Sequence, residues 1–270
     1  MSSLQCLKKV HLEIHRKDLQ VFSSDTERAF AIGHEVGDMA IRLYGQGRGV
    51  EVQYDSGLAR ALVTTGELMA CGAREPIFEA TLEHQGVLVR EDVLLPIDSG
   101  RDWRIVEVKA STSVKPEHVL DCAIQAWVHR GAGHDFERIS LAHIDNQFRY
   151  RGDGNFDGLL EENDLTEAVQ KELPSVPHWV EAAKEAVEGP MPDIPVGAHC
   201  TKPYACPFMG YCWPSDTEYP ISGLGGSRKK LGLLVLNGYE DIRDVPPSDI
   251  SGAGHERIHR VTRAGEPELL

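Results

Sequence analysis

Three charged residues of this chain stand inside two apolar, strand-like runs. Asp92 lies in VREDVLLP, and Glu107 and Lys109 lie in WRIVEVKAS, so that the three form the spacing D-x14-E-x-K. Burying carboxylates and an ammonium group beside Val, Leu and Ile is costly unless the charges are paired or hold a metal ion. These two runs are therefore where we look first for chemistry.

The period of a β-strand predicts how these side chains lie. Because alternate residues of a strand share a face, Glu107 and Lys109 should project side by side, with Val108 on the other face. A hairpin through PIDSGRD would bring Asp92 close to them. Two neighbouring carboxylates suit Mg2+ or Mn2+, which prefer oxygen ligands, and a lysine beside them can orient a water whose pKa the metal lowers. This set could hydrolyse a phosphodiester, although a surface strand with an i,i+2 ion pair would show the same residues.

Three further polar residues lie on elements around these strands. His34 lies in TERAFAIGHEVGDMAIRLYG, whose three- and four-residue apolar spacing predicts a helix with His34 facing inward. Glu79 lies in the strand-like PIFEATLEHQ, and Gln125 lies near the centre of KPEHVLDCAIQAWVHRGAG, a predicted helix. By residue type alone, an inward histidine is more often a core residue than a metal ligand, and Gln125 is an ordinary polar helix residue.

The order of these motifs resembles that of the PD-(D/E)XK nuclease superfamily, specifically its branch of RecB-like and CRISPR-associated exonucleases. The resemblance implies that Lys109 assists the attacking water and that Gln125 completes the catalytic site. Glu79 matches an acidic position found in part of the branch. Members of the branch usually carry an aromatic residue three or four positions after the glutamine, where this chain has Val128 and His129.

The same resemblance implies a site for a catalytic Mg2+ or Mn2+ ion. In that branch the helix histidine, the aspartate and the glutamate bind the metal, together with a backbone carbonyl. By resemblance, the metal ligands of this chain are His34, Asp92, Glu107 and the carbonyl of Val108.

A second motif lies near the C-terminus, in HCTKPYACPFMGYCWP. Its cysteines are spaced C-x5-C-x5-C, and its prolines and glycine predict a loop. Three such cysteines cannot form a complete set of disulfides, and they need a metal and a fourth ligand. Cys71 and Cys122 lie in apolar helical patterns, where cysteine acts as a small hydrophobic residue, which leaves Cys6. The candidate ligands are thus Cys6, Cys200, Cys206 and Cys212.

The nuclease branch includes members with one N-terminal and three C-terminal cysteines that hold a [4Fe-4S] cluster. The resemblance implies such a cluster here, joining the two ends of the nuclease domain. The alternative is Zn2+ bound by four thiolates, or by three thiolates and His199. The segments around Cys6, Asp92 and the C-terminal cysteines also resemble a bacterial group of proteins whose function is unassigned.

These motifs predict an α/β protein with a restriction-endonuclease-like core, a mixed central sheet flanked by helices. We expect a nuclease domain over residues 1–215, and a linker with a small helical appendage over 216–270. The acidic stretch 151–193 is expected to be a solvated, partly helical excursion. The expected strands lie near 50–54, 76–84, 87–95, 103–110 and 137–145, and the expected helices near 25–45, 56–71, 115–131 and 177–188.

The composition is consistent with a soluble cytoplasmic protein, because no long apolar run is present that would point to a membrane. The net charge of −14 does not favour binding to DNA, but local fields matter more than the total. We expect a metal-dependent deoxyribonuclease acting on single-stranded DNA or DNA ends. The alternative is a catalytically silent iron–sulfur module that binds nucleic acid or a partner protein.

Overall fold

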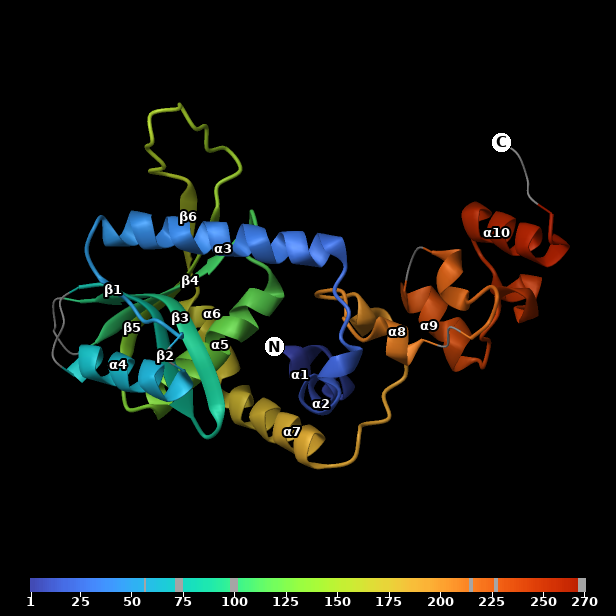
Figure 1. Ribbon diagram of the computed structural model, residues 1–270, viewed down its shortest axis with the longest axis horizontal. Helices are drawn as coiled ribbons and strands as arrows, with labels where there is room; N and C mark the ends of the chain where they lie inside the picture. The colour runs from blue at the N-terminus through green and yellow to red at the C-terminus, as the bar shows by residue number, and fades with distance from the viewer. Residues whose placement is uncertain (56, 71–74, 98–101, 214–215, 226–227, 267–270) are drawn as a thin grey trace. The chain divides into compact units, whose positions relative to one another are not determined.

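The computed structural model describes residues 1–55, 57–70, 75–97, 102–213, 216–225 and 228–266 (Figure 1). The chain is an α/β protein with a six-stranded mixed sheet in the order β1-β2-β3-β4-β5-β6. Strands β1 and β2 are parallel, as are β4 and β5, and the other neighbours are antiparallel. The strands are β1 (Val50–Glu51), β2 (Ile77–His84), β3 (Val87–Pro96), β4 (Trp103–Lys109), β5 (Phe136–Ile144) and β6 (Leu160–Asp164).

Helices cover both faces of this sheet. Helix α3 (Ser24–Gly45) packs Val36 and Ala40 against one face, and the other face packs against α4 (Leu58–Ala70) and α5 (Pro116–Gly131). Alternate residues of β4 belong to the two cores, since Ile105 packs under α5 and Val106 under α3. The helices that follow the sheet are α6 (Thr166–Glu172) and α7 (Val176–Glu188).

The chain divides into two compact units. One comprises residues 27–180 and contains the sheet, and the other comprises residues 1–26 and 181–270. The expected boundary after residue 215 does not coincide with this division, because the segments before and after it share one core. That core includes Val196, Cys200 and Trp213 together with Leu231 and Ile242.

The second unit contains short helices linked by turns. They are α1 (Ser2–Gln5), α2 (Leu7–His15), α8 (Met209–Cys212), α9 (Arg228–Leu236) and α10 (Ala253–Ala264). The region expected to be a small helical appendage contains α9 and α10. None of the helices in the described ranges combines the length and apolar composition of a bilayer-spanning segment.

The interpretation of 151–193 as an excursion is partly wrong. Residues 160–164 form the edge strand β6, which pairs with β5. The segment LEEND reads as a loop because it is polar, yet Glu162 is held at the sheet by Arg104 and by the hydroxyl of Tyr44, whose oxygen lies 3.0 Å from the carboxylate. These contacts also tie α3 to the sheet.

Candidate functional site

Strand β4 presents Glu107 and Lys109 on the face that α5 covers, as the strand period predicts. Glu107 contacts Gln125 and Lys109 contacts Asp121, and both partners lie on α5. Val108 packs in the core on the opposite face.

Strand β2 breaks its alternation of faces at Glu79. Ile77 packs in the core beneath α4 and α5, and Phe78 packs in the core beneath α3. Strict alternation would send Ala80 to the α3 side, but Ala80 packs with Ile77. Glu79 lies between them with φ +56°, a left-handed conformation that is uncommon for a residue with a side chain. Such irregularities re-aim side chains and occur often beside functional sites.

Strand β3 breaks its alternation at the matching position. Val89 and Leu94, five residues apart, pack in the same core, so that the faces exchange between them. Asp92 lies at this exchange, and its Oδ2 accepts a 2.7 Å hydrogen bond from the N–H of Val108 on β4. Burial raises the pKa of Asp92 well above its usual range, and the charge of Glu107 acts in the same direction.

Glu107 is buried, and each of its carboxylate oxygens has a partner. Oε1 accepts from the Lys109 ammonium group, and Oε2 accepts a 2.6 Å hydrogen bond from Gln125 Nε2. Burial raises the pKa of Glu107 and outweighs the opposing effect of Lys109. Gln125 is therefore a direct neighbour of the E-x-K strand.

Lys109 bridges two carboxylates, because its Nζ also donates to Asp121 Oδ2 at 2.8 Å. Burial alone would lower the pKa of Lys109, but the charges of Glu107, Asp121 and Asp92 outweigh it and leave the pKa well above its ordinary value. Asp121 was not predicted as a site residue from the sequence. Its position four residues before Gln125, on the same helical face, is the signal that could have found it.

Glu79 forms an ion pair with Arg90, with 2.7 Å between Oε2 and the guanidinium nitrogen. Burial raises the pKa of Glu79, Arg90 opposes this, and the charge of Glu107 raises it further. Glu79 is therefore electrostatically coupled to the carboxylates beside it.

The expectation that His34 faces inward is wrong. His34 is exposed, as are its neighbours from Glu27 to Glu35, and the first buried residue of α3 is Val36. The apolar period predicted which residues align on the helix, but only the packing against the sheet decides which stretch of the helix is covered. Electrostatic interaction with His34 nevertheless lowers the pKa of Glu79.

Among the described residues, no three His, Cys, Asp or Glu side chains are grouped closely enough to hold a metal ion as they stand. The donor chemistry nevertheless fits Mg2+ or Mn2+, because Asp92 and Glu107 supply carboxylate oxygens in a poorly hydrated place. Gln125 Oε1 is also buried, and no donor in the described ranges reaches it. A buried acceptor without a hydrogen bond lowers the stability of the fold until water or another donor satisfies it.

The four cysteines of the predicted cluster line one pocket in the unit of residues 1–26 and 181–270. All four are free thiols, and the pocket is lined also by Lys8, Lys9 and His199. Burial raises the pKa of Cys206, and it raises the pKa of Cys212 to about 11, with the nearby thiols adding to both shifts and lysines opposing them. The four thiols and the imidazole of His199 are the donor types that [4Fe-4S] or Zn2+ takes, although these side chains are not grouped closely enough to hold a metal ion as they stand.

Hydrogen bonds dock the N-terminal segment on the cysteine loop. Gln5 Nε2 donates to the carbonyls of His199 and Tyr204, each at 2.7 Å. The N–H of Val21 donates to the carbonyl of Pro207 at 2.9 Å. Cys6 thereby lines the same pocket as the three C-terminal cysteines. Cys122 is buried in the core of the other unit, whereas Cys71 lies outside the described residues.

Comparison with known proteins adds little to this geometry. No family model and no curated protein matches the sequence. A solved structure titled "Crystal structure of SSO0001" aligns with 72% of this chain and 77% of its own, at 16% identity and a TM-score of 0.31. At that level two chains need not share a fold, so a function must be supported by the site itself.

Proposed function

We propose that the chain is a metal-dependent nuclease that hydrolyses phosphodiester bonds of DNA, with the restriction-endonuclease-like core that its motifs resemble. The observation that carries the proposal is the convergence of Asp92, Glu107, Lys109 and Gln125 from two strands and one helix. Asp92 and Glu107 would hold Mg2+ or Mn2+, with the carbonyl of Val108 and with His34 as further ligands.

A bound divalent ion would polarise the scissile phosphate and lower the pKa of a water molecule. The chain's own groups have distinct tasks around it. Lys109 stays protonated at neutral pH because its neighbours raise its pKa, so it would orient the attacking water and balance negative charge rather than accept a proton. Gln125 would fix Glu107 through Nε2, which leaves Oε1 to accept a hydrogen bond from water.

We also propose that the cysteine pocket holds a structural [4Fe-4S] cluster. The shared pocket of Cys6, Cys200, Cys206 and Cys212 supports this assignment, together with the 3.4 Å contact from the N–H of Gly197 to the sulfur of Cys200. Hydrogen bonds to ligand sulfurs are typical of metal–thiolate sites.

The test of the proposed function is cleavage by protein purified without oxygen. The protein is incubated with end-labelled single-stranded and double-stranded DNA, with Mn2+, with Mg2+ or with EDTA. We expect products with the metals and none with EDTA. The absence of cleavage on every DNA substrate, with a folded and metal-supplemented protein, would contradict the proposal and favour a binding module.

A further inference from the structure

The loop between β5 and β6, residues 145–159, carries three aromatic side chains in a stack. The rings of Tyr150 and Phe156 lie 4.6 Å apart at an interplanar angle of 11°, and those of Phe148 and Phe156 lie 6.4 Å apart at 22°. None of the three belongs to a hydrophobic core formed by the described residues. Tyr150 is half exposed, at 50%.

Interactions within the loop and with α3 hold the three rings in a defined arrangement. The hydroxyl of Tyr150 accepts a 3.0 Å hydrogen bond from the N–H of Gly154. The N–H of Asp145 donates to the carbonyl of Leu159 at 2.9 Å and closes the base of the loop. The guanidinium of Arg42 lies 5.9 Å from the centre of the Phe156 ring and links the stack to α3.

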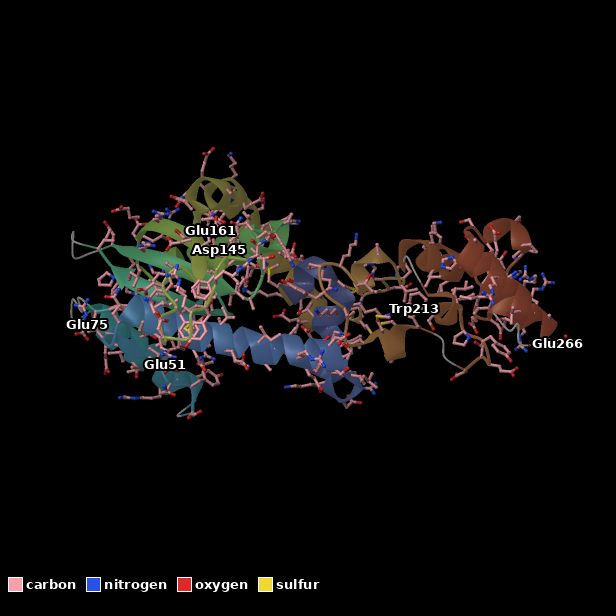
Figure 2. The ribbon with its side chains drawn as sticks, turned by 90° about the horizontal axis from the view of Figure 1, so that it is seen from above. Glu51, Glu75, Asp145, Glu161, Trp213 and Glu266 are labelled. Atoms are coloured by element: carbon pink, nitrogen blue, oxygen red, sulfur yellow. The ribbon has the colours of Figure 1, made fainter. Side chains whose placement is uncertain are left out.

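The loop leaves the sheet at the end where the candidate site lies. His143 of β5 is in register with Lys109, and the loop begins at Asp145, two residues further on. Figure 1 shows the loop projecting beyond β6, and Figure 2 labels Asp145 and Glu161, which flank its base. All of these residues belong to the unit of residues 27–180.

We infer that the stack of Phe148, Tyr150 and Phe156 is a platform on which unpaired nucleobases of a single-stranded substrate stack. The rings are near-parallel, with Tyr150 exposed and Phe148 and Phe156 half-buried. They offer a base the face-to-face geometry it adopts in nucleic acids, and such contacts tolerate any base. Edge-on pairs, such as His129 with Phe136 at 83°, serve packing inside the sheet unit instead. This inference rests on the proposed function for its choice of a nucleic acid, and it makes the substrate single-stranded.

Positive and negative side chains of the loop balance one another, so base stacking on the loop can be distinguished from phosphate binding. Arg149 and Arg151 are balanced by Asp153 and Asp157, and all four line the surface beside the stack. A platform of this kind should therefore bind an oligonucleotide with bases more tightly than an abasic one. The salt dependence of binding should be nearly the same for both.

The test measures binding by fluorescence anisotropy of a labelled thymidine oligonucleotide and of an abasic oligonucleotide of equal length. Ca2+ replaces Mn2+ so that no cleavage is required. We expect the wild type to prefer the oligonucleotide with bases by about 5-fold or more, the range of a single base stacked on an aromatic ring. Tyr150→Ala should abolish that preference, and Tyr150→Trp should retain it. Leu88→Ala, which truncates another exposed apolar side chain of the same unit, should leave it unchanged.

Equal wild-type affinity for the two oligonucleotides would overturn the inference, and so would an unchanged preference in Tyr150→Ala. In either case the stack would serve the loop itself or a protein partner. The result is independent of catalysis. A base preference without any cleavage would contradict the proposed nuclease and keep the platform, whereas cleavage without a base preference would do the reverse.

Discussion

Lys109 is the residue whose environment most constrains its role. It touches Glu107 and Asp121, and their charges keep it protonated. Replacing Lys109 by Ala should therefore reduce cleavage by about 100-fold or more, the usual contribution of a positioned polar group. Binding of Mn2+, measured by calorimetry, should change little, because the lysine is not a ligand. Lys171→Ala, which breaks an exposed ion pair with Glu167 in the same unit, serves as the control.

The outcome for Lys109 separates two roles. Loss of cleavage together with loss of Mn2+ binding would mean that the lysine organises the carboxylates, and it would contradict a role limited to the water. Retained cleavage at the wild-type rate would remove Lys109 from the site.

At the scale of elements, a buried pair fixes β3 to α5 behind the candidate site. His129 Nδ1 lies 3.0 Å from Glu91 Oε1, and both side chains are fully buried. His129 lies four residues after Gln125 on α5, and its imidazole is matched to the Glu91 carboxylate. Burial alone lowers the pKa of His129, but Glu91 outweighs it and raises the pKa above its ordinary value of 6.5.

This pair predicts a pH dependence of stability. Because the folded pKa of His129 is raised, its contribution is fully present below pH 6.5 and is lost as the pH rises through the raised value. Glu91→Gln should destabilise the protein by about 3–5 kcal/mol at the acidic end, since it breaks a buried pair. Urea titrations over a pH series should show a smaller loss of stability with rising pH in the variant. The same slope in both proteins would assign the pH dependence to other groups.

The cysteine pocket gives a second prediction at this scale. Protein purified without oxygen should be brown and contain about four irons per chain. Cys6→Ser should bleach it and lower its melting temperature, because Cys6 belongs to a segment distant in sequence from the other three cysteines. Cys122→Ser should leave the iron content unchanged. Zinc without iron in the wild type would contradict the cluster, and a normally loaded Cys6→Ser variant would contradict the ligand set.

Sequence predicted the elements of the sheet unit well because their signals are local. The faces of β4 follow from strand alternation, and α5 follows from its apolar period. The irregularity at Glu79 and Asp92 could not be predicted, since it depends on two strands exchanging faces at matching positions. The exposure of His34 depends on how far α3 extends past its contacts with the sheet. Strand β6 was missed because Glu162 is stabilised by arginines from other strands.

At the scale of the whole molecule, the C-terminal appendage shares a core with the cysteine segment, so its deletion would expose Val196 and Trp213. Whether the exposed Arg260 and Arg263 of α10 contact DNA is tested by replacing both with Gln. If both contact phosphates, affinity should fall, and the slope of log affinity against log salt should lessen by about two. Lys17→Gln with Lys171→Gln gives the same change in net charge as a control. An unchanged slope and affinity would leave α10 a packing role alone.

The measurement that tests the central claim most directly compares cleavage by Asp92→Ala with cleavage by the wild type, in Mn2+. Circular dichroism establishes that both are folded, and Asp38→Ala, which removes an exposed carboxylate of α3, is the matched control. We predict that Asp92→Ala loses cleavage by at least about 100-fold, because it removes a carboxylate that would hold the divalent ion, while Asp38→Ala cleaves normally. Cleavage by Asp92→Ala at the wild-type rate would contradict the assignment of this site.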